Sequence, residues 1–304
     1  MSKLLRAAAL VPLAGSLATS LALPVLLAAC SNDPTSDGPN SSPNRVPAEI
    51  AGTFRHYGAA LEVGNGRARA YVVLDEQNAN RPLEVGVALD ATAMNGLPAP
   101  TAPAPGTDPH AHVDTKEYLL TLPAQHGTPY QFITLDWNAS GHEPPGIYDL
   151  PHFDFHFYTI SPAEREAILP TDPAFAQKAA NFPTAAYVPA GYMVLPPPPA
   201  PVNAVPRMGV HWLDVASPEL QAPTSPNYKA FTYTFIHGSW NGQFIFDEPM
   251  ITRAFLLTQP DLTRPLSQPA QFAKPGYYPT NFRIKYDAEA KEYRIALGGL
   301  TKRQ

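Results

Sequence analysis

Cysteine is almost absent from this chain, since Cys30 is the only one among 304 residues. A single cysteine cannot pair with another in the same chain, so no internal disulfide stabilises the fold. Charged residues are also scarce, at 15% of the chain against about 25% in typical domains. The net charge of −5 and the lack of a basic patch argue against a nucleic-acid partner. After Ala29, no apolar run is long enough to span a bilayer.

The N-terminal segment has the features of a bacterial lipoprotein signal. Lys3 and Arg6 precede an uncharged, mostly apolar run that ends in Leu-Ala-Ala-Cys at positions 27–30. In such signals small residues precede the cleavage point, and the thiol of the following cysteine takes the lipid. We expect residues 1–29 to be a signal peptide and Cys30 to carry acyl chains, of which two or more anchor a protein stably. The alternative is an uncleaved anchor helix that ends by chance in a cysteine.

A lipidated Cys30 predicts that the protein is held outside the cytoplasm with the membrane as a partner. Ser31, rather than an aspartate, follows the cysteine, which favours the outer membrane if the host has one. Residues 30–48 are rich in Ser, Asn and Pro and are expected to form a flexible tether. Residues 49–304 are then expected to form the folded, β-rich part.

Proline is abundant, with 37 residues in the chain, and it interrupts both helices and central strands. This composition favours short strands joined by long loops. The expected fold is an antiparallel β-sandwich or barrel with two short inserted helices. Ser161, Pro162 and Glu164 form the pattern of a capping box at the start of the first helix. The expected strands are 67–74, 83–89, 117–122, 130–137, 147–159, 208–214, 229–238, 243–247, 251–257, 281–286 and 293–297.

The seven residues from His152 to Tyr158 alternate polar and aromatic side chains. Successive side chains of a strand point to opposite faces, so the alternation separates two chemistries. The aromatic face, with Phe153, Phe155 and Phe157, is expected to join the core. The other face gathers His152, Asp154, His156 and Tyr158.

Three residues on the polar face, His152, Asp154 and His156, are suitable ligands for zinc, iron or manganese. On a straight strand, residues two apart are separated by about 6.6 Å and residues four apart by about 13 Å. Two neighbours can therefore share one ion comfortably, whereas all three can do so only on a bent strand. The remaining ligands must come from other strands.

Three further residues are candidates for those ligands, namely His211, His237 and Glu248, each within a predicted strand or at its end. Zinc is the default ion because nitrogen ligands dominate the set. Two alternatives stay open: a metal-free polar cluster that binds or catalyses, and a purely structural hydrogen-bonded network. The nearby Gly141–Gly146 segment, which includes His142 and Glu143, is interpreted as a turn at the tip of a hairpin.

The segments Gly141–Tyr148 and Pro151–Tyr158 resemble a family of secreted bacterial proteins of unknown function, represented structurally by a small Thermus protein. The segments Pro206–Trp212, Phe246–Thr252 and Gly276–Pro279 also look like that family. The resemblance extends from about Thr53 to the C-terminus. It implies a β-rich fold and supplies no established activity, so no catalytic residue is carried over.

Two classes of function follow from these predictions. The favoured one is a non-catalytic envelope protein that binds a small-molecule ligand or assembles with copies of itself. The alternative is a metal-dependent hydrolase or lyase that acts outside the cytoplasm. An enzyme requires an open coordination position on the metal, whereas a binding protein fits a closed site or none.

Overall fold

The computed structural model describes residues 44–100, 114–124, 126–196 and 203–304. The predicted signal peptide, Cys30 and residues 31–43 of the predicted tether lie outside these residues. The described chain belongs to one compact unit, Ser41–Gln304. Its first strand, β1 (Arg45–Pro47), pairs with β2 and lies inside the segment expected to be the tether. None of the helices in the described ranges has the length and hydrophobicity needed to cross a bilayer.

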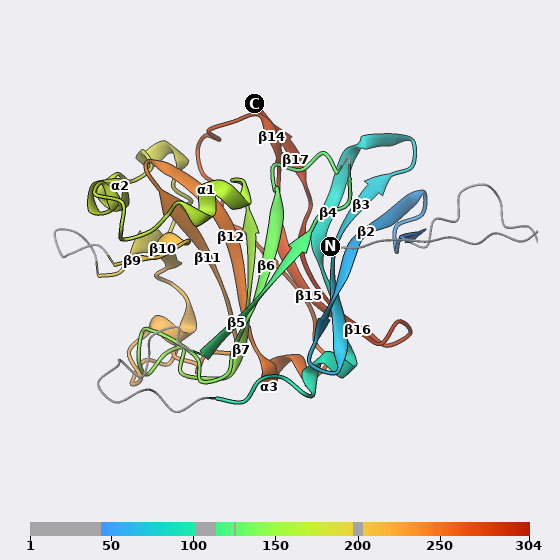
Figure 1. The fold of residues 1–304 in the computed structure, drawn as a ribbon, viewed down its shortest axis with the longest axis horizontal. Helices are drawn as coiled ribbons and strands as arrows, with labels where there is room; N and C mark the ends of the chain where they lie inside the picture. Colours follow the sequence, from blue (N-terminus) through green and yellow to red (C-terminus); the bar gives the residue numbers. More distant parts are fainter. Residues whose placement is uncertain (1–43, 101–113, 125, 197–202) are drawn as a thin grey trace, which may run out of the picture. The chain divides into compact units, whose positions relative to one another are not determined.

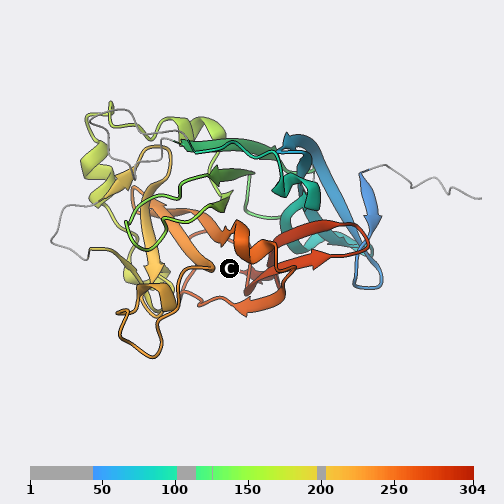
Figure 2. The same ribbon diagram turned by 90° about the horizontal axis from the view of Figure 1, so that it is seen from below.

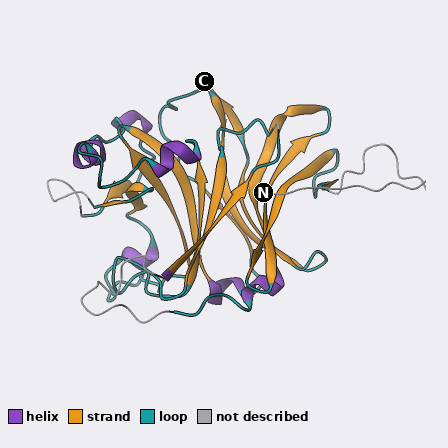
Figure 3. Cartoon of the chain, viewed as in Figure 1, coloured by secondary structure: helices purple, strands orange, loops and turns teal. Residues whose placement is uncertain are grey.

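The fold is built from two large antiparallel sheets (Figures 1 and 3), which confirms the prediction of a mainly β protein. Both sheets are open, and neither closes into a barrel within the described residues. The seven-stranded sheet has the order β1-β2-β3-β4-β16-β15-β13. Its other strands are β2 (Thr53–Val63), β3 (Gly66–Asp75), β4 (Asn78–Asp90), β13 (Asp261–Pro265), β15 (Asn281–Asp287) and β16 (Glu292–Gly298).

The eight-stranded sheet carries the candidate site. Its order is β5-β6-β7-β12-β11-β10-β8, and β9 adds to β10. The strands are β5 (Thr115–Thr121), β6 (Phe132–Asn138), β7 (His152–Tyr158), β8 (Tyr192–Val194), β9 (Ala204–Val205), β10 (Gly209–Asp214), β11 (Tyr233–Trp240) and β12 (Gln243–Thr252). A separate pair joins β14 (Gly276–Tyr278) to β17 (Thr301–Arg303).

The helices are short and lie at the ends of strands or in the connections between them (Figure 3). The two expected helices follow β7, as α1 (Pro162–Glu166) and α2 (Phe175–Ala180), and the capping box of Ser161 and Glu164 is present. The expected strand 251–257 is wrong, because β12 ends at Thr252 and α3 (Arg253–Leu256) begins there, capped by the Thr252 hydroxyl. The described ranges also contain the 3₁₀ turns η1 (Ala91–Met94), η3 (Ala185–Tyr187) and η4 (Pro218–Leu220).

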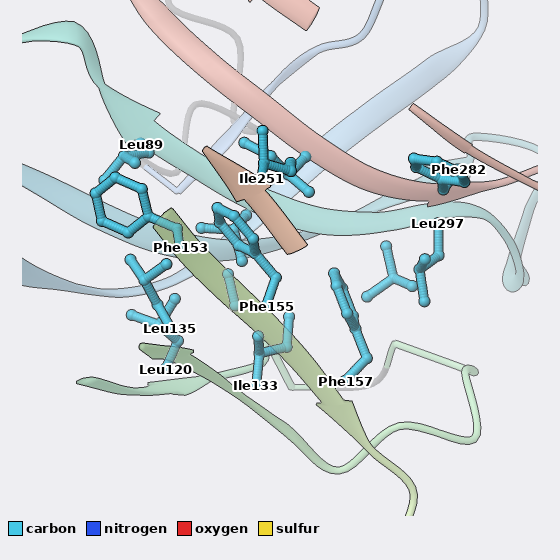
Figure 4. Packing of buried hydrophobic residues seen from close by; sticks show 14 of the residues in the cluster. Leu89, Leu120, Ile133, Leu135, Phe153, Phe155, Phe157, Ile251, Phe282 and Leu297 are labelled. Atoms are coloured by element: carbon cyan, nitrogen blue, oxygen red, sulfur yellow. The ribbon is translucent and has the colours of Figure 1, made fainter. Parts of the chain in front are cut away.

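The main core lies between the two sheets, where side chains from both form one hydrophobic cluster (Figures 2 and 4). Phe153, Phe155 and Phe157 are fully buried in it, as their spacing on β7 predicted. They pack with alternate residues of the neighbouring strand β6, such as Ile133 and Leu135. Each of these rings removes a large apolar area from water, so this face of β7 fixes the strand at the centre of the fold.

The opposite face of β7 is buried as well, which the sequence did not indicate. One small apolar cluster covers one end of this outer face, with Tyr148, Phe231 and Met250 among its members. A second cluster, which includes Tyr158 and Ile168, covers the other end. The polar side chains of β7 therefore lie in a belt between two apolar patches, shielded from water.

Candidate functional site

The outer face of β7 carries two histidine–carboxylate triads that could each hold a metal ion. We call His142, His152 and Asp154 the first triad, and His156, His211 and Glu248 the second triad. In each triad one ligand atom per residue lies within 4.8 Å of the others. The strand spacing thus had the predicted effect: His152 and Asp154 share one triad, whereas His156 belongs to another.

The first triad joins β7 to the connection that precedes it. His142 lies in the 139–151 segment between β6 and β7, which folds back over the sheet. A hydrogen bond from the backbone N–H of His142 to the carbonyl oxygen of Tyr148 closes this segment. His142 Nε2 is 3.2 Å from Asp154 Oδ2, and His152 Nε2 is 3.1 Å from Asp154 Oδ1. The two imidazole centres are 4.6 Å apart.

Backbone carbonyls fix the tautomer of both histidines in the first triad. His142 Nδ1 lies 2.7 Å from Glu143 O, and His152 Nδ1 lies 2.6 Å from Leu150 O. A carbonyl oxygen only accepts, so each Nδ1 carries the proton and each neutral ring has its lone pair on Nε2. Both lone pairs then face the carboxylate of Asp154.

When both rings are neutral, this arrangement places three electron-pair donors in contact inside the protein. His152 Nε2 and Asp154 Oδ1 make no hydrogen bond with any residue in the described ranges, although they are 3.1 Å apart. A proton on His142 Nε2 would turn its 3.2 Å contact with Asp154 Oδ2 into a hydrogen bond. One cation between the three atoms would relieve the contact of His152 Nε2 with Asp154 Oδ1 as well.

The distances also suit a small metal ion. Tetrahedral zinc binds nitrogen and oxygen at about 2.0–2.2 Å, which places neighbouring ligand atoms about 3.4 Å apart. The two contacts to Asp154 are within a few tenths of an ångström of this value. Asn138 Nδ2 donates to Asp154 Oδ2 over 2.6 Å and so orients the carboxylate. Backbone and amide bonds of this kind commonly hold metal ligands in place.

The first triad is closed to solvent. His142 is 8% exposed, His152 0% and Asp154 2%. The rings of Tyr148 and Phe231 stand against the two imidazoles. Burial opposes charge on Asp154, but the two histidines lower the pKa of that carboxyl well below its usual value. Burial likewise opposes charge on His142, and Asp154 more than offsets it and raises the pKa of that ring.

The second triad draws its residues from three strands, β7, β10 and β12. His156 Nε2 is 3.3 Å from Glu248 Oε1, and His211 Nε2 is 3.9 Å from Glu248 Oε2. The register of β7 with β12 pairs Phe246 with Tyr158 and Met250 with Asp154, which places Glu248 opposite His156. His156 and Glu248 are buried, but the side chain of His211 keeps 22% of its surface exposed.

In the second triad, His156 lies between two carboxylates rather than beside a carbonyl. Its Nδ1 is 3.3 Å from Asp136 Oδ2 on β6. Burial lowers the pKa of His156, but Glu248 and Asp136 outweigh it and raise the pKa to about 9. Burial, with help from nearby Asp154, raises the pKa of Glu248. A protonated His156 between two acids is compatible with this geometry. His156 Nε2, Glu248 Oε2 and both oxygens of Asp136 nevertheless make no hydrogen bond within the described ranges, and the second triad could also hold a metal ion.

A glycine makes room beside the second triad. Gly238 of β11 pairs with His211, and a Cβ atom there would lie 2.0 Å from the ring of Phe246. That ring packs against both histidines, with centres 4.9 Å from His156 and 5.6 Å from His211. A larger residue at position 238 would displace Phe246 and disturb the triad.

His237 belongs to neither triad. It pairs across the hairpin with Asp247, and its Nδ1 lies 2.6 Å from Asp247 Oδ1. Glu248 instead pairs with Ile236, which puts His237 and Glu248 on opposite faces of the sheet. Tyr158, the last polar residue of the alternating segment His152–Tyr158, packs in the apolar cluster around Phe132 and Ile168.

His142 is the site residue that sequence reasoning missed. It was interpreted as part of a hairpin tip, which a regular hairpin would hold away from His152. The 139–151 connection is long enough to fold back instead, and the backbone bond between His142 and Tyr148 closes it. The available signal was a histidine within ten residues of His152 in a segment rich in turn formers.

Comparison with known proteins shows a family-model match over part of the chain. The model of the TTHB210-like family, described as hypothetical protein TTHB210, matches residues 78–137, from the start of β4 to Trp137 of β6. No curated protein and no solved structure matches the chain. The matched segment ends before Gly141–Tyr158, the signature on which the resemblance was based. Similarity to this family is therefore shown for residues 78–137, and it brings no assigned activity.

Proposed function

We propose that the protein binds one divalent cation of the zinc class at the first triad, through His142, His152 and Asp154. The observation that carries this is the pair of Nδ1–carbonyl hydrogen bonds, at 2.7 and 2.6 Å, which turn both Nε2 lone pairs toward Asp154. Two nitrogens and one carboxylate form a donor set that zinc prefers.

The role we assign to this ion is structural, in a protein that binds a ligand or assembles in the cell envelope. All three ligands are nearly inaccessible to solvent, so a substrate has no path to the ion. The ion would tie the 139–151 connection to β7 and thereby hold the cover over the outer face of the sheet. Such a site adds its binding free energy to the stability of the fold.

We further propose that the protein is anchored outside the cytoplasm by lipid on Cys30. The support is the sequence alone: Lys3 and Arg6, the apolar run and the small residues before the single cysteine. Labelling of cells with an alkyne-bearing palmitate tests this proposal, with Cys30→Ser as the control. Label on wild type and none on the variant is expected, whereas an unlabelled, soluble wild type would contradict the anchor.

The alternative function is a metal-dependent hydrolase or lyase centred on the second triad. The partial exposure of His211, at 22% of its side chain, favours this reading because water could complete the coordination of an ion there. Hydrolysis or elimination that is lost in both His156→Ala and His211→Ala would support it.

Elemental analysis of the purified protein tests the metal proposal. After growth with zinc and purification without chelator, we expect about one equivalent of zinc per chain, because the proposed site is the first triad alone. His142→Ala and His152→Ala should lose it, and His211→Ala should retain it. His126→Ala, whose ring contacts Thr128 away from both triads, is the matched control. A wild-type chain without stoichiometric metal that also fails to bind added zinc would overturn the proposal.

A further inference from the structure

A pocket of about 310 Å³ lies at the turn of the β11–β12 hairpin, and none of its lining residues is a member of either triad. Its walls come from that hairpin, from the 183–189 segment, from the 266–279 segment that includes β14, and from residues next to the start of β6 and the end of β7. A hydrogen bond from the backbone N–H of Gln271 to the carbonyl oxygen of Ala186 joins the 266–279 segment to the 183–189 segment. The volume is at the lower end of the range of about 300–1,000 Å³ that is usual for small-molecule sites.

The wall of the pocket is largely made of rings. Among its lining residues are Pro183, Pro189, Tyr187, Phe244, Phe272 and Tyr278. Flat apolar surfaces of this kind hold the apolar body of a small ligand, and aromatic faces also attract cations.

On the hairpin side of the pocket lies the carboxylate of Asp247, which accepts hydrogen bonds from two side chains. His237 Nδ1 donates to Asp247 Oδ1 over 2.6 Å, and the hydroxyl of Tyr130 donates to Asp247 Oδ2. Both oxygens therefore act as acceptors, and the side chain of Asp247 still keeps 17% of its surface exposed. A carboxylate so oriented needs little rearrangement to accept a further donor from a ligand.

The charges around the pocket favour a cation. Among the described residues that line the pocket, Asp247 is the one carboxylate, and the one ammonium group, that of Lys274, is exposed. An anionic ligand would meet Asp247 in a largely apolar space, where repulsion between like charges is weakly screened.

We propose that this pocket binds a small organic amine, with its apolar body against the proline and aromatic rings and its ammonium group facing Asp247. His237 and Tyr130 act as positioning residues that hold the carboxylate. This function is separate from the metal proposal, because neither Asp247 nor His237 belongs to a triad.

A matched set of probes tests the proposal: benzylamine, benzyl alcohol and benzoate share a ring and differ in the charge of the head group. Binding is measured by ligand-observed NMR at pH 7 and low salt. Benzylamine should bind at least about tenfold more tightly than benzyl alcohol, the ratio that corresponds to one charge-assisted hydrogen bond. Benzoate should show no binding at the same concentrations.

The variant Asp247→Asn keeps the shape of the side chain and removes its charge, so it should abolish the preference for the amine over the alcohol. Asp261→Asn, which alters an exposed carboxylate on β13 outside the pocket, is the matched control and should keep it. If Asp247→Asn does not fold, Lys274→Glu at the exposed rim serves instead, and it should tighten amine binding.

Three results would overturn the proposal. They are the absence of benzylamine binding at millimolar concentration, binding of benzoate as tight as that of benzylamine, and an unchanged amine preference in Asp247→Asn or in Lys274→Glu. His211→Ala separates this site from amine coordination to an ion at the second triad. Amine affinity should be the same in that variant, and its loss there would place the binding at the triad instead.

Discussion

The two triads share one strand and one face of the sheet, but they differ in what their imidazole nitrogens contact. In the first triad, each Nδ1 donates to a backbone carbonyl and each Nε2 faces Asp154. In the second, both nitrogens of His156 face carboxylates, those of Asp136 and Glu248. The first arrangement is the one for which we propose a metal ion, whereas in the second a proton on His156 can lie between the two carboxylates.

This difference shows that the number of histidines and acids in a cluster does not by itself identify a metal site. The partner of the second imidazole nitrogen decides the matter, because it sets which nitrogen can offer a lone pair. On β7, His152 and Asp154 are two positions apart, and so are Asp154 and His156, so the contrast comes from the neighbouring segments.

Removal of the central carboxylate should have the largest effect on this contrast. Asp154→Ala leaves two buried histidines without their partner and removes a metal ligand. We expect a loss of about 3–5 kcal/mol in the free energy of unfolding, the usual result of breaking a buried charged pair. Urea denaturation followed by tryptophan fluorescence measures it. A loss below about 1 kcal/mol would show that Asp154 has no charged partner of importance.

Removal of the ion should come next in size. A chelator should lower the stability of the wild type by about 2.7 kcal/mol if free metal had been at a hundred times its dissociation constant. The same treatment of His142→Ala should change nothing, because that variant starts without the ion. Thermal unfolding with and without chelator gives both values. Equal shifts in the two proteins would place the ion elsewhere.

A smaller effect is expected from His211→Ala. Its ring is partly exposed and its nearest nitrogen is 3.9 Å from Glu248, a long contact for an ion pair. The loss in unfolding free energy should stay within about 1 kcal/mol, and bound zinc should be unchanged. Urea denaturation together with elemental analysis checks both. Loss of zinc in this variant would make the second triad the metal site.

The weakest expected effect concerns a carboxylate whose partners are permanent cations. Glu49 pairs with Arg283 and Lys285 on the other sheet. Burial raises the pKa of Glu49, but hydrogen bonds and charges of these partners lower it to about 2, from 4.5. Because the folded pKa is depressed, its stabilising contribution is complete above pH 4.5 and is lost as the pH falls toward 2.

Glu49→Gln should therefore reduce stability by no more than about 1 kcal/mol at pH 7, since the pair is partly exposed. The difference from wild type should shrink between pH 4.5 and 2. Denaturation curves across this range measure it. A difference that is constant with pH would mean that the charge of Glu49 contributes nothing.

The sequence by itself determined the local features of this protein. The alternation in His152–Tyr158 assigned Phe155 to the core, and the Ser161 capping box placed the start of α1. Strand geometry also predicted that two neighbouring ligands of β7, but not all three, would share one site, and it left open which two. Each of these rests on residues close in the chain, whose relative positions follow from backbone periodicity alone.

Only the tertiary structure decided which partners meet β7 and on which face. The 139–151 connection brings His142 to Asp154 by folding back, and no local pattern encodes that path. The face of His237 depends on the register of the β11–β12 hairpin, which contains an irregularity between Gly238 and Ser239. A shift of one residue moves every side chain of a strand to the opposite face, so long-range pairing had to settle what strand periodicity left open.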